Sequence, residues 1–238
     1  MAIQARTKGR PGTIGMKLPM RVWDGATRLF HWAIVLLMAV SYASVSLAYG
    51  PRALLWMQIH LISGDTMLAL LLFRLAWGIF GSDTARFQRF LQSPRAAFRH
   101  LAEFRRSPPD TQVGHNAAGG WMVVILLALL LLVVVTGLFA NDDGATTGPL
   151  AQFVSKSTSD QLSALHGSAF DVLLGASALH VVAVVWYLGV KRQNLILPMI
   201  TGKKRLPAAT PSPRMRSPLL AAATLAVAAA LATLIGRL

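Results

Sequence analysis

The sequence predicts an all-α integral membrane protein: a four-helix transmembrane bundle with a further C-terminal transmembrane helix. Of its 238 residues, 54% are hydrophobic and only 13% are charged, about half the charged fraction of an average soluble domain. The hydrophobic residues form runs of about 20 residues, the length at which a helix crosses a bilayer. The runs also lack the alternation of a membrane β-barrel, so we expect helices rather than strands.

Five apolar runs mark the expected spans, which are residues 29–48, 54–80, 120–140, 163–190 and 219–234. Asp24 precedes the first run and is a candidate N-cap of its helix. The fifth run is rich in alanine and follows a proline-rich linker, so we expect the fifth helix to stand apart from the first four. The predicted organisation is a basic segment 1–20, a four-helix domain 21–205, a linker 206–218 and a fifth helix 219–238.

The Lys and Arg residues are distributed unevenly among the segments that flank the spans. Of the 23 Lys and Arg residues, 19 lie in three segments, 1–28, 83–114 and 191–216, which alternate with connecting segments poor in Lys and Arg. This is the positive-inside pattern of a multi-pass membrane protein. It predicts that the N-terminus and both basic loops are cytoplasmic. It also argues against a nucleic-acid partner, which would require a basic face outside the membrane.

The chain contains no cysteine. Disulfides, cysteine-ligated zinc, iron–sulfur clusters and covalently attached haem are therefore excluded.

Histidine is the residue type that indicates a function. His100 lies in a basic loop and is expected to be solvated or interfacial, whereas the other five lie in or at the ends of the spans. Ionisable residues in a span are costly and mark functional sites. His166 and His180 are 14 residues apart, just under four helical turns, so they share a face about 21 Å apart along the axis. They cannot bind one ion and instead predict two sites at different depths.

Each site has a partner histidine at its own depth. His31 lies near the cytoplasmic end of the first span, level with His180, and His60 lies near the outer end of the second, level with His166. Two facing pairs of neutral imidazoles in a bundle core are what two non-covalent haems require. The alternatives are hydrogen-bonded core histidines, or a metal such as zinc, for which no carboxylate cluster completes the ligand shell.

Three residues of the second span fit a haem protein. Gly64 follows His60 by four residues and leaves room for a flat macrocycle on the same face. Arg74 lies 14 residues after His60, at the depth of His31 and His180, and a buried Arg requires an anion such as a haem propionate. Gly78 follows Arg74 by four residues, as Gly64 follows His60.

Each of three further residues has two alternative interpretations. His115, in "GHNAAGG", is expected either to hydrogen-bond a propionate or a quinone carbonyl, or to be a capping or interfacial residue. Asp65 and Asp171 each lie five residues past a proposed ligand, near the outer boundary. They are either proton-handling or quinone residues, or hydrated polar residues.

Several motifs, taken together, resemble one known family over about residues 20–205. They are "RVWDGATRLFHW", "HLISGDTMLALLLFRLAWGIFGS", "ARFQRFLQSPR", "GHN", "TGLFANDDGATTGPL", "LHGSAFDVLLGASALH" and "VKRQNLILPMITGKK". They resemble the bacterial cytochrome b561 family, which includes the b-type cytochrome subunits of nickel–iron hydrogenases. The resemblance implies a four-helix bundle with two b haems stacked across the membrane. Its ligand positions fall on His31 with His180 and on His60 with His166.

The expected function is electron transfer by a dihaem b-type cytochrome of the bacterial cytoplasmic (inner) membrane. It would connect the quinone pool with a redox partner, such as a periplasmic c-type cytochrome. Two alternatives keep the cytochrome: a superoxide:quinone oxidoreductase, or the membrane-anchoring subunit of a hydrogenase or other dehydrogenase. A different class, a proton or ion transporter with a His/Asp relay, predicts a colourless protein.

Overall fold

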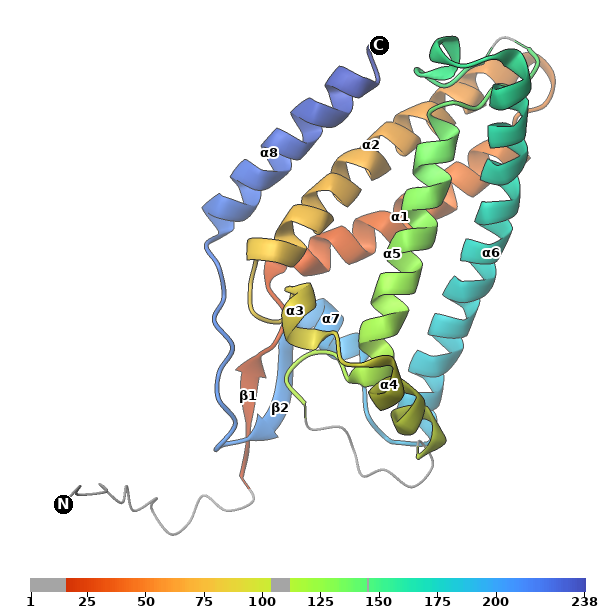
Figure 1. The fold of residues 1–238 in the computed structure, drawn as a ribbon. Helices are drawn as coiled ribbons and strands as arrows, with labels where there is room; N and C mark the ends of the chain where they lie inside the picture. Colours follow the sequence, from red (N-terminus) through yellow and green to blue (C-terminus); the bar gives the residue numbers. More distant parts are fainter. Residues whose placement is uncertain (1–15, 104–111, 145) are drawn as a thin grey trace.

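The computed structural model describes residues 16–103, 112–144 and 146–238. Four long helices form the bundle and alternate in direction along the chain: α1 (Gly25–Ser46), α2 (Ala53–Phe80), α5 (Ala117–Gly137) and α6 (Lys156–Gly189). A fifth long helix, α8 (Pro218–Ile235), lies outside α2 (Figure 1). Within the described ranges, these five helices are long and apolar enough to cross a membrane, which confirms the predicted fold class.

Short elements connect the long helices. They are β1 (Lys17–Arg21), η1 (Gly50–Arg52), α3 (Phe87–Phe90), α4 (Pro94–Ala102), η2 (Ala151–Phe153), α7 (Ile196–Thr201) and β2 (Lys203–Pro207). β1, β2, α3, α4 and α7 gather at one end of the bundle, where α1 and α5 begin and α2 and α6 end (Figure 1). We call this the basic end, because the three Lys/Arg-rich segments meet there.

Side-chain caps fix where four of the five long helices begin, α2 being the exception. The Asp24 carboxylate accepts a hydrogen bond from the Thr27 amide at 2.7 Å, which confirms Asp24 as the N-cap of α1. Asn116, Ser155 and Ser217 cap α5, α6 and α8 in the same way. α6 begins at Lys156 rather than at residue 163, because the Ser155 cap starts the helix two polar turns before the apolar run.

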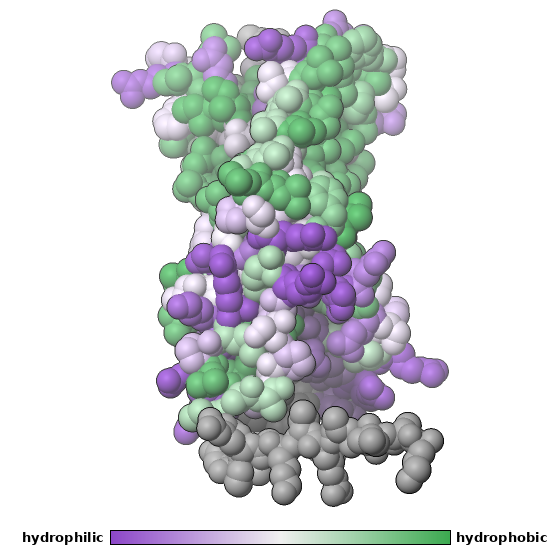
Figure 2. All heavy atoms as spheres, turned by 90° about the vertical axis from the view of Figure 1, so that its left-hand side faces the viewer, coloured by the Kyte–Doolittle hydropathy of each residue, from purple (hydrophilic) through white to green (hydrophobic). Residues whose placement is uncertain are grey.

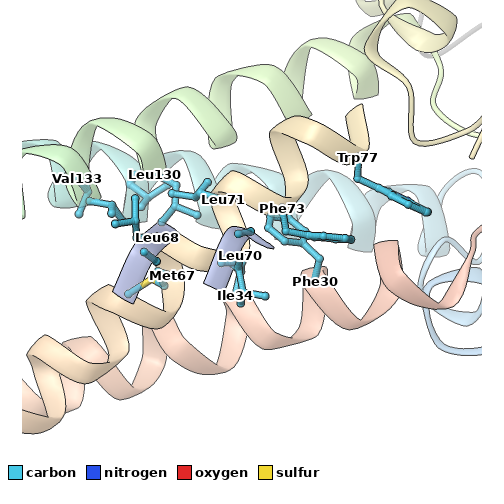
Figure 3. Packing of buried hydrophobic residues seen from close by; sticks show 14 of the residues in the cluster. Phe30, Ile34, Met67, Leu68, Leu70, Leu71, Phe73, Trp77, Leu130 and Val133 are labelled. Atoms are coloured by element: carbon cyan, nitrogen blue, oxygen red, sulfur yellow. The ribbon is translucent and has the colours of Figure 1, made fainter. Parts of the chain in front are cut away.

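The hydrophobic core is centred on α2 and lies between α1 and α5. Figure 3 shows its main residues, which are Phe30, Ile34, Met67, Leu68, Leu70, Leu71, Phe73, Trp77, Leu130 and Val133. Leu71 and Trp77 are only 1% exposed. The Trp77 indole N–H donates to the Asp24 carboxylate at 3.1 Å, so the capping residue of α1 also fastens α1 to α2.

α6 is packed differently from the other three helices. Of its 34 residues only Ser159, Ala169 and Leu173 are buried. It packs closely along α5, and neither α1 nor α2 approaches it as closely. The side of α6 that faces α1 and α2 is therefore sparsely filled by protein.

A two-stranded sheet, which the hydrophobic runs did not predict, holds the basic end together. β1 and β2 pair antiparallel, with Leu18 opposite Leu206, and Leu206 packs with Val22 and Trp23. Gly202 ends α7 in the left-handed conformation, with φ of 79°, and its carbonyl accepts the Val22 amide at 2.8 Å. The start of α1 is thereby tied to the segment that follows α6.

The expectation that α8 stands apart from the bundle is wrong. α8 packs along α2, and residues of both helices, among them Leu72 and Phe80 of α2 and Leu231 of α8, line a groove between them. The segment before α8 is held at the basic end, because the Asp83 carboxylate accepts the Arg214 amide and the Ser82 hydroxyl accepts the Arg216 amide, both at 3.0 Å.

Figure 2 shows the face of the molecule that carries α8. Hydrophobic residues cover the upper part of this face, and hydrophilic residues gather at its top edge and across its lower part. This distribution is that of a membrane-spanning region between two aqueous layers.

Leu71→Ala is expected to destabilise the bundle by about 2–5 kcal/mol, because it empties a fully packed site between helices. Thermal unfolding in detergent measures this loss. Leu36→Ala is the matched control, since Leu36 is 64% exposed. An equal effect of the two substitutions would contradict the placement of the core.

Candidate functional site

The four histidines predicted as ligands come together as two pairs. The rings of His31 on α1 and His180 on α6 have centroids 6.5 Å apart. The rings of His60 on α2 and His166 on α6 have centroids 6.0 Å apart. The first pair lies toward the basic end and the second toward the opposite end, as the positions of these residues along the helices require. Thus α6 supplies one histidine to each pair.

Both separations suit one metal ion held between two imidazoles. A metal–imidazole bond of about 2 Å on each side, plus about 1.1 Å from nitrogen to ring centre, places the two centroids about 6 Å apart. The sparse packing between α6 and the α1–α2 pair leaves the surroundings of each pair open to a flat group. Among the described residues, no cluster of three or more His, Cys, Asp or Glu forms a metal shell.

At the His60–His166 pair, backbone carbonyls accept hydrogen bonds from the imidazoles. His166 Nδ1 lies 2.8 Å from the Val133 carbonyl oxygen, and His60 Nδ1 lies 3.3 Å from the Ser41 carbonyl oxygen. A carbonyl only accepts, so each Nδ1 carries the proton and each Nε2 keeps its lone pair for a metal.

The residues that arrange these contacts were not predicted from the sequence. The Ser44 hydroxyl also donates to the Ser41 carbonyl at 2.8 Å, and the Ser41 and Ser63 hydroxyls are 2.8 Å apart. Gly137 allows the His166 ring to approach α5, since a Cβ there would lie 2.9 Å from the ring. The two serines three residues apart on α1 were a visible signal, whereas Gly137 looks like any helix-ending glycine.

The His31–His180 pair has a different environment, with polar groups that lack partners. Five buried side-chain atoms of the described residues have no hydrogen-bond partner: Thr27 Oγ1, Arg28 Nε, His31 Nδ1, Thr84 Oγ1 and His115 Nδ1. All five belong to residues of the basic end. Buried polar groups are normally satisfied, so this group of donors and acceptors fits a polar ligand, such as the carboxylates of a haem.

Arg74 is buried at the basic end, as predicted, with 3% of its surface exposed. Its guanidinium donates to the Ala85 carbonyl at 3.2 Å and stacks over the Phe87 ring at 4.9 Å. Within the described ranges it forms no salt bridge with a carboxylate. The buried Asp24 carboxylate attracts the Arg74 charge without forming a salt bridge, so an anion in the site would share this charge with Asp24.

The two glycines predicted to leave room for a macrocycle differ. A Cβ on Gly64 would meet nothing within 4 Å, so the space there is open. A Cβ on Gly78 would overlap the Phe87 ring. The interpretation of Gly78 is therefore revised: its missing side chain admits Phe87, which in turn supports Arg74.

His115 lies next to the His31–His180 pair. Its ring packs between those of Trp23 and Phe90, with centroids 4.7 and 4.8 Å away. Burial, followed by the charge of Arg74 and the proximity of His180 and His31, lowers the pKa of His115 to about 3. His115 is therefore neutral and can donate or accept a hydrogen bond.

The other polar residues lie outside the two pairs. An Asp65 carboxylate oxygen is 3.3 Å from where a Cβ on Gly236 would be, so Asp65 faces the end of α8, and Asp171 is exposed. His100, expected to be solvated or interfacial, is half-buried on α4, and its Nε2 lies 3.0 Å from the Tyr187 hydroxyl.

Five apolar helices, four of which form a bundle that holds two pairs of half-buried histidines, are typical of a class of protein, the multi-pass membrane cytochromes. The family model described as prokaryotic cytochrome b561 matches residues 22–202, so the chain belongs to this family. It is a membrane b-type cytochrome that binds haem and acts in electron transfer. No curated protein and no solved structure matches the chain.

Gly78→Ala is expected to lower the thermal stability in detergent, because a methyl group there must displace the Phe87 ring. Gly64→Ala adds the same methyl group to the same helix in open space and should not lower the stability of the haem-free protein. Equal melting temperatures of the two haem-free variants would contradict the packing of Phe87 on Gly78.

Proposed function

We propose that the protein carries electrons across the cytoplasmic membrane through two b haems, one at each histidine pair. The supporting observation is the separation of the paired rings, 6.5 and 6.0 Å, which suits two imidazoles on one iron. His31 and His180 would hold one haem, and His60 and His166 the other. A b-type haem, when bound, carries one electron by cycling its iron between the ferrous and ferric states.

The protein residues determine what each haem can do. With both histidines of a pair bound to the iron, no position would remain open for oxygen, which would favour electron transfer over oxygen chemistry. His166 and His180 are 14 residues apart on α6, about 21 Å along the axis, so the two pairs span most of the hydrocarbon layer. At the basic end, Arg74 would compensate the charge of a propionate.

The basic end is placed in the cytoplasm by the positive-inside rule. The His60–His166 pair then lies toward the periplasm, where Asp142 and Asp143 could attract a basic redox partner such as a c-type cytochrome. Quinone is the natural partner of such a protein within the membrane. His115, which is neutral and beside the His31–His180 pair, is the candidate to hydrogen-bond either a propionate or a quinone carbonyl.

The purified protein is expected to show a b-type α-band in its dithionite-reduced minus oxidised spectrum, with two haems per chain by pyridine haemochrome. His180→Ala and His166→Ala should each lose one haem, because each breaks a different pair, and His100→Ala should lose none. A colourless protein, prepared with haem available, would favour a transporter instead.

Arg74→Gln is expected to lower the midpoint potential of one haem only. A nearby positive charge stabilises the reduced state, and Arg74 is buried at the basic end, where its charge acts on His115. Potentiometric titration of the α-band measures the shift, with Arg95→Gln as the control, since Arg95 is an exposed residue of α4. Two unchanged potentials in Arg74→Gln would place its charge outside the site.

A further inference from the structure

Gly137, the last residue of α5, lies against the His166 ring. A Cβ at this position would be 2.9 Å from Cε1 and 3.0 Å from Nδ1 of His166. Any residue with a side chain would push the imidazole away from α5 or force the two helices apart. The close approach of α6 to α5 at this level therefore depends on glycine.

The close approach places His166 Nδ1 2.8 Å from the Val133 carbonyl oxygen, one helical turn before Gly137. The same oxygen accepts a second hydrogen bond, from the Thr136 hydroxyl at 3.0 Å. The acceptor for His166 is thus a backbone carbonyl, which no side-chain substitution removes. The space that the His166 ring occupies depends on the missing side chain at position 137.

The other pair lacks such a contact. His31 Nδ1 is buried and has no hydrogen-bond partner, whereas both histidines of the His60–His166 pair have a carbonyl within reach. A hydrogen bond from Nδ1 to an acceptor makes the imidazole a stronger electron donor at Nε2. A stronger donor stabilises ferric over ferrous iron and lowers the midpoint potential.

We propose that Gly137 is a positioning residue for His166, and that the resulting Nδ1–Val133 contact lowers the potential of the haem at the His60–His166 pair. This inference rests on the proposed dihaem function. It assigns the lower potential to the haem farther from the basic end. The positive charge of Arg74 increases this difference in potential, because it would raise the potential of the haem at the His31–His180 pair.

The test compares Gly137→Ala with Gly189→Ala in the purified, haem-loaded protein. Gly189 is an exposed glycine of α6, and a Cβ added there would meet nothing within 4 Å, so both substitutions add one methyl group to a helix. The measurements are the haem count, the redox titration of the α-band and the low-spin electron paramagnetic resonance spectrum. Gly137→Ala should raise the lower of the two potentials and alter one of the two low-spin signals, and Gly189→Ala should change neither.

A second variant keeps the test decisive if Gly137→Ala loses that haem or does not fold. Thr136→Val removes a hydroxyl that lies 3.0 Å from the Val133 oxygen and 2.7 Å from the Leu132 oxygen, so His166 becomes, among the described residues, the one side chain that donates to the Val133 oxygen. It should shift the same potential in the opposite direction, downward. A general packing defect predicts no such reversal of sign, and an unchanged potential in Thr136→Val would then overturn the inference.

The outcomes separate this inference from the function on which it rests. A wild-type protein without two haems contradicts the dihaem proposal itself. A wild-type protein with two haems, together with a Gly137→Ala variant whose potentials and spectra equal those of Gly189→Ala, leaves the function intact and overturns the role of Gly137.

Discussion

Placing imidazole rings inside a membrane costs free energy, and the arrangement of this bundle depends on how that cost is met. A polar ring that leaves water must find partners for its nitrogens, because none is supplied by the hydrocarbon layer. At the His60–His166 pair, the Nδ1 atoms have partners in the carbonyls of Ser41 and Val133. At the end of the bundle that holds the His31–His180 pair, several buried polar atoms of the described residues have no hydrogen-bond partner. The core on α2 and the caps of α1 and α5 place these groups where an added cofactor can satisfy them.

The packing of α6 follows from the same constraint. If His166 and His180 hold cofactors, as proposed, the face of α6 that carries them cannot also be buried against protein, and only three residues of α6 are buried. Its position depends instead on α5 along one side and on connections at its ends. At the basic end, the α7 segment supplies carbonyls to Trp32, at 3.2 Å, and to Arg28. The helices that carry His31 and His180 are thereby joined at this end, and farther along them Tyr42 of α1 stacks on Phe170 of α6, with ring centroids 5.9 Å apart.

Much of this arrangement was predictable from periodicity. The spans follow from runs of apolar residues, and the pairing of histidines follows from the 14-residue spacing of His166 and His180 together with the direction of each helix. The cap at Asp24 was also visible. The sheet of β1 and β2 was not, because its strands are short and polar and their pairing joins the two ends of the family domain. The packing of α8 was misjudged, because the hydrogen bonds that the linker amides of Arg214 and Arg216 donate to Asp83 and Ser82 leave no local pattern in the sequence.

The two proposed haem sites differ in ways that a spacing argument could not reveal. From the sequence, Gly64, Gly78 and Gly137 are equivalent interruptions of apolar helices. In the structure, Gly64 borders open space, Gly78 receives an aromatic ring and Gly137 receives a histidine. The missing side chain has a different neighbour in each case, and only the tertiary structure supplies that neighbour. If the lower potential belongs to the His60–His166 pair, an electron rests more favourably at the basic end, beside Arg74 and the neutral His115. A quinone reduced there would also lie near the water at the basic end, from which it must take protons.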